Sequence, residues 1–290
     1  MRFIKPHSTI SSVITGAVVF GFIGCQRVNL SRSATVPPTP ARFEANRPAR
    51  PEPQDDDPYA DFREARYSND GLLDEASEIK LGARLHQEVM KKFRPTNVGL
   101  PRVNQIGQRM AKASLRPNLV YTFHIIQSRE INGFSLPGGH VYVTTALLKL
   151  ATDDELASVL AHEVGHVVAR HSLKTLQQSQ EFDGIAKALG SLAGIAGETA
   201  RDLGTSLAQL VGQGFLTLHT RDEEREADFL GVRTLPRAGV SPQAMVTMFR
   251  KLQRISGEDA SLLGSFFSDH PDLQERIDNT RYEIARMRKQ

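Results

Sequence analysis

A metal site and a general base are combined in the five residues His162-Glu163-Val164-Gly165-His166. Two histidines spaced four residues apart lie on one face of an α-helix, one turn from each other, so both imidazoles can bind a single ion. Glu163, between them, then faces the open side of that ion, where it can accept a proton from water. The motif therefore predicts metal-assisted hydrolysis, with His162 and His166 as ligands and Glu163 as the base.

The neighbouring residues predict the helix that this motif requires. Thr152 and Glu155 form a capping box, and apolar residues follow at helical spacing. Gly165 interrupts the pattern and costs about 1 kcal/mol relative to alanine, which makes sense if another backbone approaches the helix closely at this point. A buried helix whose histidines only satisfy hydrogen bonds is the alternative interpretation.

A second helix, predicted to begin after Thr220 and to run to Pro236, offers candidates for a third ligand. Catalytic zinc can have two histidines and one glutamate as ligands, with a fourth position left for water. Spacing alone does not choose among the carboxylates of this segment, which are Glu223, Glu224, Glu226 and Asp228. A solvated charged helix is the alternative.

The segment Glu224-Arg-Glu-Ala-Asp228 resembles the Glu-x-x-Ala-Asp signature of family forty-eight of the metallopeptidases, which includes the CAAX prenyl proteases and the HtpX-like membrane proteases. The resemblance implies a zinc endopeptidase with one Zn²⁺ per chain and Glu224 as the third ligand. It also implies that Asp228 orients a ligating histidine and that Arg221 holds these carboxylates in place.

A segment upstream of the motif is similar to a strand element of the same family. Asn132 begins it, and Pro137-Gly138-Gly139 divides it into two short β-strands joined by a turn. An edge strand near the zinc can bind an extended peptide by main-chain pairing. Asn132, Pro137, Gly138 and Gly139 are therefore expected to bind substrate.

A downstream segment, Asp269-His270-Pro271 with Arg276, is similar to the family's His-Pro segment. The resemblance places His270 and Arg276 near the zinc and makes them candidates to stabilise the anionic intermediate. Without the family match, His270 is interpreted as a turn histidine before proline. Together the motifs extend the resemblance over most of residues 72–285.

The N-terminal residues predict export and a tether. Two basic residues precede an apolar run that ends at Cys25, the only cysteine in the chain. This pattern resembles a bacterial lipoprotein processing site, so we expect a signal peptide over 1–24 and lipidation of Cys25. A plain secretory signal or an uncleaved anchor is the alternative. Seven prolines indicate a tether over 25–65, followed by a zinc metallopeptidase domain over 66–290.

Charge does not favour nucleic-acid binding. The chain has 36 Lys and Arg against 33 Asp and Glu, a net charge of +3, and cleavage before Cys25 removes two basic and no acidic residues, which leaves +1. The expected partners are protein or peptide substrates, including misfolded envelope proteins, and a membrane that is reached through the lipid anchor. Gln26 after the cysteine favours a lipoprotein of the outer membrane that faces the periplasm.

The expected fold is α+β: a mainly helical, zincin-type peptidase domain with a small β-sheet beside the zinc. Periodicity predicts helices over 72–93, 103–114 and 272–288, another that Ser241-Pro242 opens, and a strand over 120–126. The Ala-, Gly- and Leu-rich stretch 172–219 is expected to form a packed helical hairpin that covers the cleft. A lid that touches the membrane is the alternative.

The remaining histidines of this domain receive no role in the site. If the first ligand helix continues to residue 171, its histidine lies half a turn from His162 and cannot join the ion. Nothing in the spacing brings the other four to the cleft, namely His86, His124, His140 and His219.

The sequence thus predicts a zinc-dependent endopeptidase that serves protein quality control in the cell envelope. The alternative is a zinc-stabilised periplasmic chaperone or assembly factor with little proteolysis. The presence of every residue that hydrolysis requires favours the enzyme.

Overall fold

The computed structural model describes most of the chain beyond residue 56. The described residues are 57–63, 73–179, 183–186, 198–212, 219–264, 270 and 272–290. The expected signal peptide over 1–24, Cys25 and most of the expected tether lie outside them, as do Asp269 and Pro271. All the described residues belong to one compact unit, which begins at Asp55.

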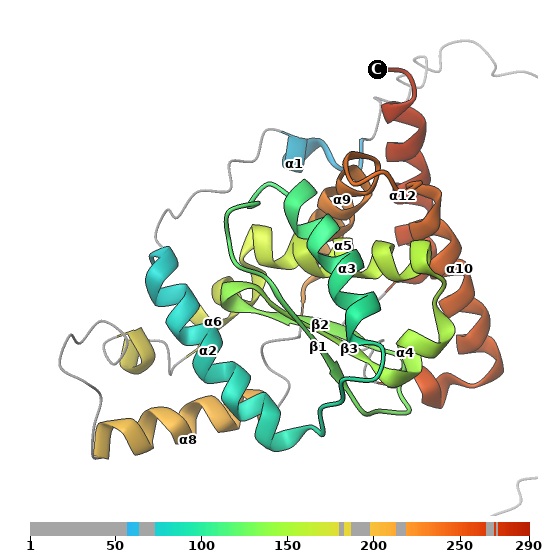
Figure 1. Ribbon diagram of the computed structural model, residues 1–290. Helices are drawn as coiled ribbons and strands as arrows, with labels where there is room; N and C mark the ends of the chain where they lie inside the picture. Colours follow the sequence, from blue (N-terminus) through green and yellow to red (C-terminus); the bar gives the residue numbers. More distant parts are fainter. Residues whose placement is uncertain are drawn as a thin grey trace, which may run out of the picture. The chain divides into compact units, whose positions relative to one another are not determined.

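A three-stranded β-sheet lies among the helices of this unit (Figure 1). Its strands, in the order β1-β3-β2, are β1 (Thr122–Ile126), β3 (His140–Thr144) and β2 (Gly133–Leu136). β3 is parallel to β1 and antiparallel to β2, and the 3₁₀ turn η1 (Pro137–Gly139) joins β2 to β3. The predicted strands around Pro-Gly-Gly are confirmed, and β2 forms an edge of the described sheet.

Helices account for most of the other described residues. They are α1 (Ala60–Arg63), α2 (Glu75–Lys92), α3 (Leu100–Ala113), α4 (Thr145–Leu150), α5 (Asp153–Ala169), α6 (His171–Gln177), α8 (Glu198–Gly212), α9 (Arg221–Arg237), α10 (Gln243–Glu258) and α12 (Leu273–Met287), with the 3₁₀ turn η3 (Ala260–Leu263). The expected α+β, mainly helical fold is confirmed. The capping box at the start of α5 is also confirmed, and α9 has one at Thr220 and Glu223. α10 follows Ser241-Pro242 as expected, but no side chain caps its first turn.

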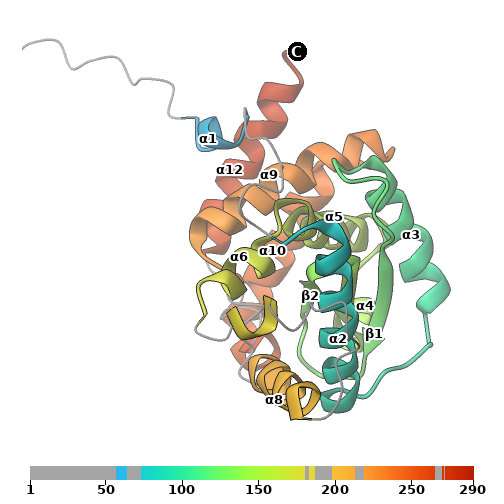
Figure 2. The ribbon, with the colours of Figure 1, turned by 90° about the vertical axis from the view of Figure 1, so that its left-hand side faces the viewer.

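The two faces of the sheet pack against different helices, because side chains alternate along each strand. Phe123 and Val141 join a core that α3 and α5 share. Phe134 and Tyr142 join a second core, to which α2, α6 and α8 contribute (Figure 2). The predicted catalytic motif is therefore carried by a helix on the α3 side of the sheet, with α2 on the opposite side.

Small residues bring α5 and α9 close together. A Cβ atom added at Gly165 would lie 2.8 Å from the carbonyl oxygen of Ala227, and one added at Gly231 would lie 3.1 Å from the backbone nitrogen of His162. The expectation that another backbone approaches Gly165 is confirmed. This close packing places residues of α9 beside the histidines of α5.

The folded domain begins earlier than the expected boundary at residue 66. Tyr59 is fully buried in the main core, and Arg63 of α1 forms ion pairs with Asp57 and with Glu283 of α12. The expected tether over 25–65 is therefore too long at its C-terminal end. The sequence did not predict these contacts, because Tyr59 and Arg63 are isolated residues beside a Pro-rich stretch and show no helical periodicity.

The stretch expected to form a hairpin over 172–219 is only partly described. α8 packs on α2 through apolar residues such as Leu207, and the ammonium group of Lys92 donates hydrogen bonds to the carbonyl oxygens of Val211 and Gly212 at the end of α8. Among the described residues, no helix is both long and apolar enough to cross a membrane. Whether this stretch covers the cleft stays a prediction.

Candidate active site

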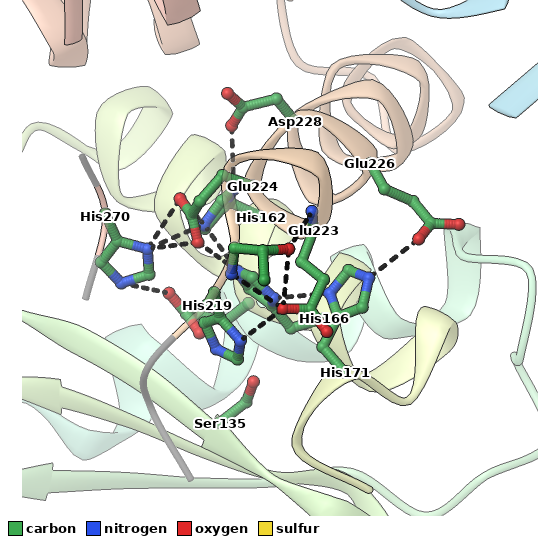
Figure 3. Close-up of polar contacts among 12 residues, drawn as sticks. Ser135, His162, His166, His171, His219, Glu223, Glu224, Glu226, Asp228 and His270 are labelled. Carbon is green, nitrogen blue, oxygen red and sulfur yellow. Dashed lines mark hydrogen bonds and ion pairs between the residues drawn. The ribbon is translucent and has the colours of Figure 1, made fainter. Parts of the chain in front are cut away.

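Three of the predicted ligands meet where α5 and α9 pack together (Figure 3). The Nε2 atoms of His162 and His166 lie 3.0 Å apart. Oxygens of Glu224 lie 3.5 Å from Nε2 of His162 and 3.2 Å from Nε2 of His166. Two ligands of a tetrahedral zinc are roughly 3.3 Å apart, so these donors are spaced for one ion. All three side chains are buried.

His270 joins the same group, which is called the ligand cluster here and consists of His162, His166, Glu224 and His270. Its Nδ1 lies 2.9 Å from both carboxylate oxygens of Glu224 and 3.4 Å from Nε2 of His162. Burial lowers the pKa of His270, but the negative charges of Glu224 and Glu163 outweigh it and raise this pKa to about 9. His270 therefore carries a proton at neutral pH in the metal-free protein.

Glu163 lies beside the ligand cluster with one carboxylate oxygen unused. Its Oε2 is buried and has no hydrogen-bond partner among the described residues, while Oε1 lies 3.9 Å from Nε2 of His270. Burial raises the pKa of Glu163 above its ordinary value, although the neighbouring His162 and His270 oppose this shift. A buried acceptor without a partner, next to three metal donors, fits a site that holds an ion and a water molecule.

Asp228 and Arg276 contact the ligands His162 and Glu224 and fix their positions. Oδ1 of Asp228 lies 2.9 Å from Nδ1 of His162, which directs the lone pair of Nε2 toward the other ligands. Arg276 donates two hydrogen bonds to Asp228, at 2.7 and 2.8 Å, and its third nitrogen lies 2.9 Å from Glu224. Arg276, expected to face the reaction intermediate, is thus paired with two carboxylates instead.

The expected contact of Arg221 with the carboxylates is wrong. Its side chain is 70% exposed, and its guanidinium pairs with Asp272 at 2.8 Å. Because Arg221 is the first residue of α9, it points to solvent, and Arg276 from α12 takes the place beside Glu224 and Asp228.

His171, which received no role from the sequence, contacts a ligand. Its Nδ1 lies 2.8 Å from Nδ1 of His166, and its Nε2 lies 2.9 Å from Oε2 of Glu226. The sequence argument assumed a continuous helix, but α5 ends at Ala169 and Arg170 adopts the left-handed conformation with φ 58°. This turn brings His171 back toward His166.

His219 also lies at the cluster. Its ring stacks on that of His166, with centroids 3.9 Å apart and planes 20° apart (Figure 3). Burial lowers the pKa of His219 to about 3, so its ring is neutral at pH 7. Its position immediately before the capping residue Thr220 was the only sequence signal for this contact.

The expected substrate-binding residues separate into two groups. Asn132 lines a small, largely apolar cavity beside His162 and Glu163. The Pro137–Gly139 turn is instead buried against α2, where the backbone N–H of Gly138 donates to Glu78 at 3.2 Å. The turn thus packs against α2, and the contact of Pro137, Gly138 and Gly139 with substrate stays a prediction.

This chain is similar in sequence to a known peptidase family and to several of its members. The model of peptidase family M48 matches residues 100–284. The beta-barrel assembly-enhancing protease of Escherichia coli (strain K12) is 32% identical over 200 residues, which cover 64% of this chain and 39% of that protein. The mitochondrial metalloendopeptidase OMA1 of Schizosaccharomyces pombe is 30% identical over 228 residues, 76% of this chain and 64% of that protein. The crystal structure of S. mikatae Ste24p has a TM-score of 0.36 and 19% identity, over 60% of this chain and 49% of that one.

The matched region includes both helices that carry the ligand cluster, and His270 as well. It extends over more than half of the chain. The spacing of the buried donors is what a metallopeptidase requires. This chain therefore belongs to peptidase family M48, whose members are metallopeptidases.

Proposed function

We propose that this protein is a zinc-dependent endopeptidase in which His162, His166 and Glu224 hold the ion and Glu163 is the general base. The observation that carries the proposal is the unpaired, buried Oε2 of Glu163 beside three donors spaced for one ion. A zinc ion held by these residues would supply a Lewis acid to polarise the scissile carbonyl group and to activate water for attack.

Proton transfer is the task of Glu163. Its carboxylate accepts a proton from the attacking water and passes it to the amine that leaves. The raised pKa of Glu163 suits this exchange, since a carboxylate whose pKa moves from its ordinary value toward neutral pH accepts a proton more readily and can still return it. His270, within the ligand cluster, is placed to donate a hydrogen bond to the oxyanion of the substrate.

Three further side chains position the ligands without touching the substrate. Asp228 fixes the tautomer of His162, and His171 contacts the ring nitrogen of His166 that faces away from the other ligands. Arg276 balances the charges of Asp228 and Glu224, which is needed because two buried carboxylates so close together repel each other.

The substrate is proposed to be an extended peptide that pairs with the edge strand β2. Gly133 of β2 lies next to the base, since a Cβ atom there would be 3.5 Å from Oε1 of Glu163. The adjoining surface is lined by Val159, Met248 and Leu252, and its apolar character favours contact with an apolar side chain of the peptide. We therefore expect cleavage next to apolar residues.

We also propose that the protein is an envelope lipoprotein with a signal peptide over 1–24 and a lipidated Cys25, held at the outer membrane and facing the periplasm. The sequence pattern supports this proposal, and misfolded envelope proteins are the proposed substrates. The E. coli relative, a beta-barrel assembly-enhancing protease, is in keeping with such a role. Labelling of cells with palmitate should mark the wild type and leave Cys25→Ser unlabelled.

The decisive experiment is casein digestion by the Glu163→Gln variant, with zinc content measured on the same samples. We expect the variant to retain zinc and to lose hydrolysis by at least a hundredfold, because the amide cannot accept the proton. Asp154→Asn, an exposed carboxylate on the same helix, is the matched control and should cleave casein at the wild-type rate. Full activity of Glu163→Gln would refute the assigned base.

A companion assay separates the enzyme from the chaperone alternative. Wild type and Glu163→Gln are compared for suppression of aggregation of an unfolded outer-membrane protein. Cleavage by the wild type alone supports the peptidase. Equal suppression by both proteins without any cleavage would instead favour a zinc-stabilised chaperone.

A further inference from the structure

Three histidines from separate elements meet on the face of the sheet that α2 covers. They are His86 of α2, His124 of β1 and His140 of β3, called the histidine triplet here. In the parallel pairing of β1 and β3, Thr122 lies opposite His140 and His124 lies opposite Tyr142. His124 and His140 are thus diagonal neighbours on one face. The catalytic helix α5 packs in the core on the other side of the sheet.

The nitrogens of the triplet are spaced for a metal ion. Nε2 of His124 lies 3.4 Å from Nδ1 of His140, which matches the roughly 3.3–3.4 Å between two nitrogens bound to one tetrahedral zinc. One nitrogen from each of the three rings lies within 4.8 Å of the others. His86 is half-buried on α2, and its ring stacks on those of His124 and His140, with centroids 4.4 and 4.9 Å away. Its ring must therefore turn to direct a nitrogen at the same ion.

A hydroxyl group directs the third ligand. Nδ1 of His86 lies 2.7 Å from the hydroxyl oxygen of Tyr142, and a ring nitrogen that donates such a bond leaves Nε2 with a free lone pair. Thr122 lies 2.9 Å from Nδ1 of His140 and 3.2 Å from Nε2 of His124. An ion bound by His124 and His140 would therefore take the place of the Thr122 hydroxyl hydrogen beside their ligand nitrogens.

We infer that the histidine triplet binds a second transition-metal ion of the zinc or copper class, separate from the catalytic ion. Three imidazoles favour these ions over magnesium and calcium, which prefer oxygen ligands. All three residues are half-buried, so one coordination position remains open to solvent or to an exogenous ligand.

An ion in the triplet would tie α2 to β1 and β3. α2 carries α8 through the second core, so the ion stabilises the side of the domain that faces away from α5. The inference does not depend on the proposed peptidase activity, because none of its ligands belongs to the ligand cluster.

The test counts zinc in the full-length protein after saturation and desalting. The wild type should hold two equivalents of zinc. The His162→Gln/His166→Gln variant and the His124→Gln/His140→Gln variant should each hold one. Of these two variants, only His124→Gln/His140→Gln should still cleave casein. Cu²⁺ added to the variant that lacks His162 and His166 should give an electron paramagnetic resonance signal with nitrogen couplings. The inference would be overturned if the wild type bound one equivalent of zinc, or if the second equivalent persisted in the variant that lacks His124 and His140.

A single substitution tests the same site in case the His124→Gln/His140→Gln variant does not fold. His86→Gln alters a half-buried side chain of α2 and should weaken the second zinc equivalent at least tenfold, while the first is unchanged. In the His162→Gln/His166→Gln background, zinc should raise the unfolding temperature, and His86→Gln should abolish this rise. A zinc-dependent rise of the same size with and without His86 would count against the triplet.

Discussion

Replacing Gly165 with alanine should weaken zinc binding without touching a ligand. The added Cβ atom would lie 2.8 Å from the carbonyl oxygen of Ala227, whereas ordinary contact begins at 3.4 Å, so α5 and α9 must separate there by up to 3.4 − 2.8 = 0.6 Å. Zinc ligands tolerate only about 0.2 Å of error in distance. Since Glu224 belongs to α9 and both histidines to α5, we expect the zinc affinity to fall roughly 10–100-fold, or about 1.4–2.7 kcal/mol.

The effect on folding is smaller because two contributions oppose each other. Alanine favours the helix by about 1 kcal/mol relative to glycine, whereas overpacking in a close contact costs about 1–3 kcal/mol. Metal-free Gly165→Ala should therefore lose about 0–2 kcal/mol of its free energy of unfolding. Zinc affinity is measured by competition with a fluorescent chelator, and stability by urea unfolding in the presence of a metal chelator.

Gly204 in α8 provides the matched control, because a Cβ atom added there meets nothing within 4 Å. Gly204→Ala should leave zinc affinity unchanged and stabilise the protein by up to about 1 kcal/mol. If Gly165→Ala binds zinc as tightly as wild type, the close packing of α5 and α9 does not set the position of the third ligand, and the reasoning fails.

Three other changes have defined outcomes. His171→Phe should lower zinc affinity roughly 10–100-fold in the same competition assay, because His166 loses the partner of its Nδ1. Arg221→Ala should change stability by less than about 0.5 kcal/mol and leave casein cleavage intact, as its side chain is mostly exposed. Burial raises the pKa of Glu155, but hydrogen bonds from Lys251 and the backbone outweigh it and lower this pKa below 4.5. Lys251→Met should therefore lower the free energy of unfolding, measured with urea at pH 7, by about 1.5–3 kcal/mol. This difference should shrink as the pH falls through the lowered pKa of Glu155, because the wild type then loses the same contribution. A difference that persists at pH 2 would contradict the assignment.

Local chemistry made the two ligand helices predictable. The capping boxes at Thr152 and Thr220 fix where α5 and α9 begin, and Gly165 signals a close approach before the partner is known. The spacing of carboxylates left Glu224 among four candidates, and the family signature separated it from the others. The structure then placed it between the two histidines.

The missed contacts all depend on tertiary structure or on rare backbone conformations. Arg170 is not glycine, yet it takes the left-handed conformation that ends α5 and returns His171 to the cluster, and sequence periodicity gives no warning of this. Arg276 replaces Arg221 beside the carboxylates because α12 packs against α9 at that point. His124 and His140 meet only through the parallel register of β1 and β3, which links positions distant in the chain.

The ion pairs of α1 also have a mechanical consequence. Arg63 forms an ion pair with Glu283 on α12, the helix that also carries Arg276. Arg276 in turn pairs with Asp228, which contacts Nδ1 of His162. Glu283 and Arg276 lie about two turns apart on α12, so α12 links the ion pair of α1 to the carboxylates of the ligand cluster. A change at the N-terminal end of the described domain can therefore alter the position of Asp228 behind His162 without any contact with the ligand cluster.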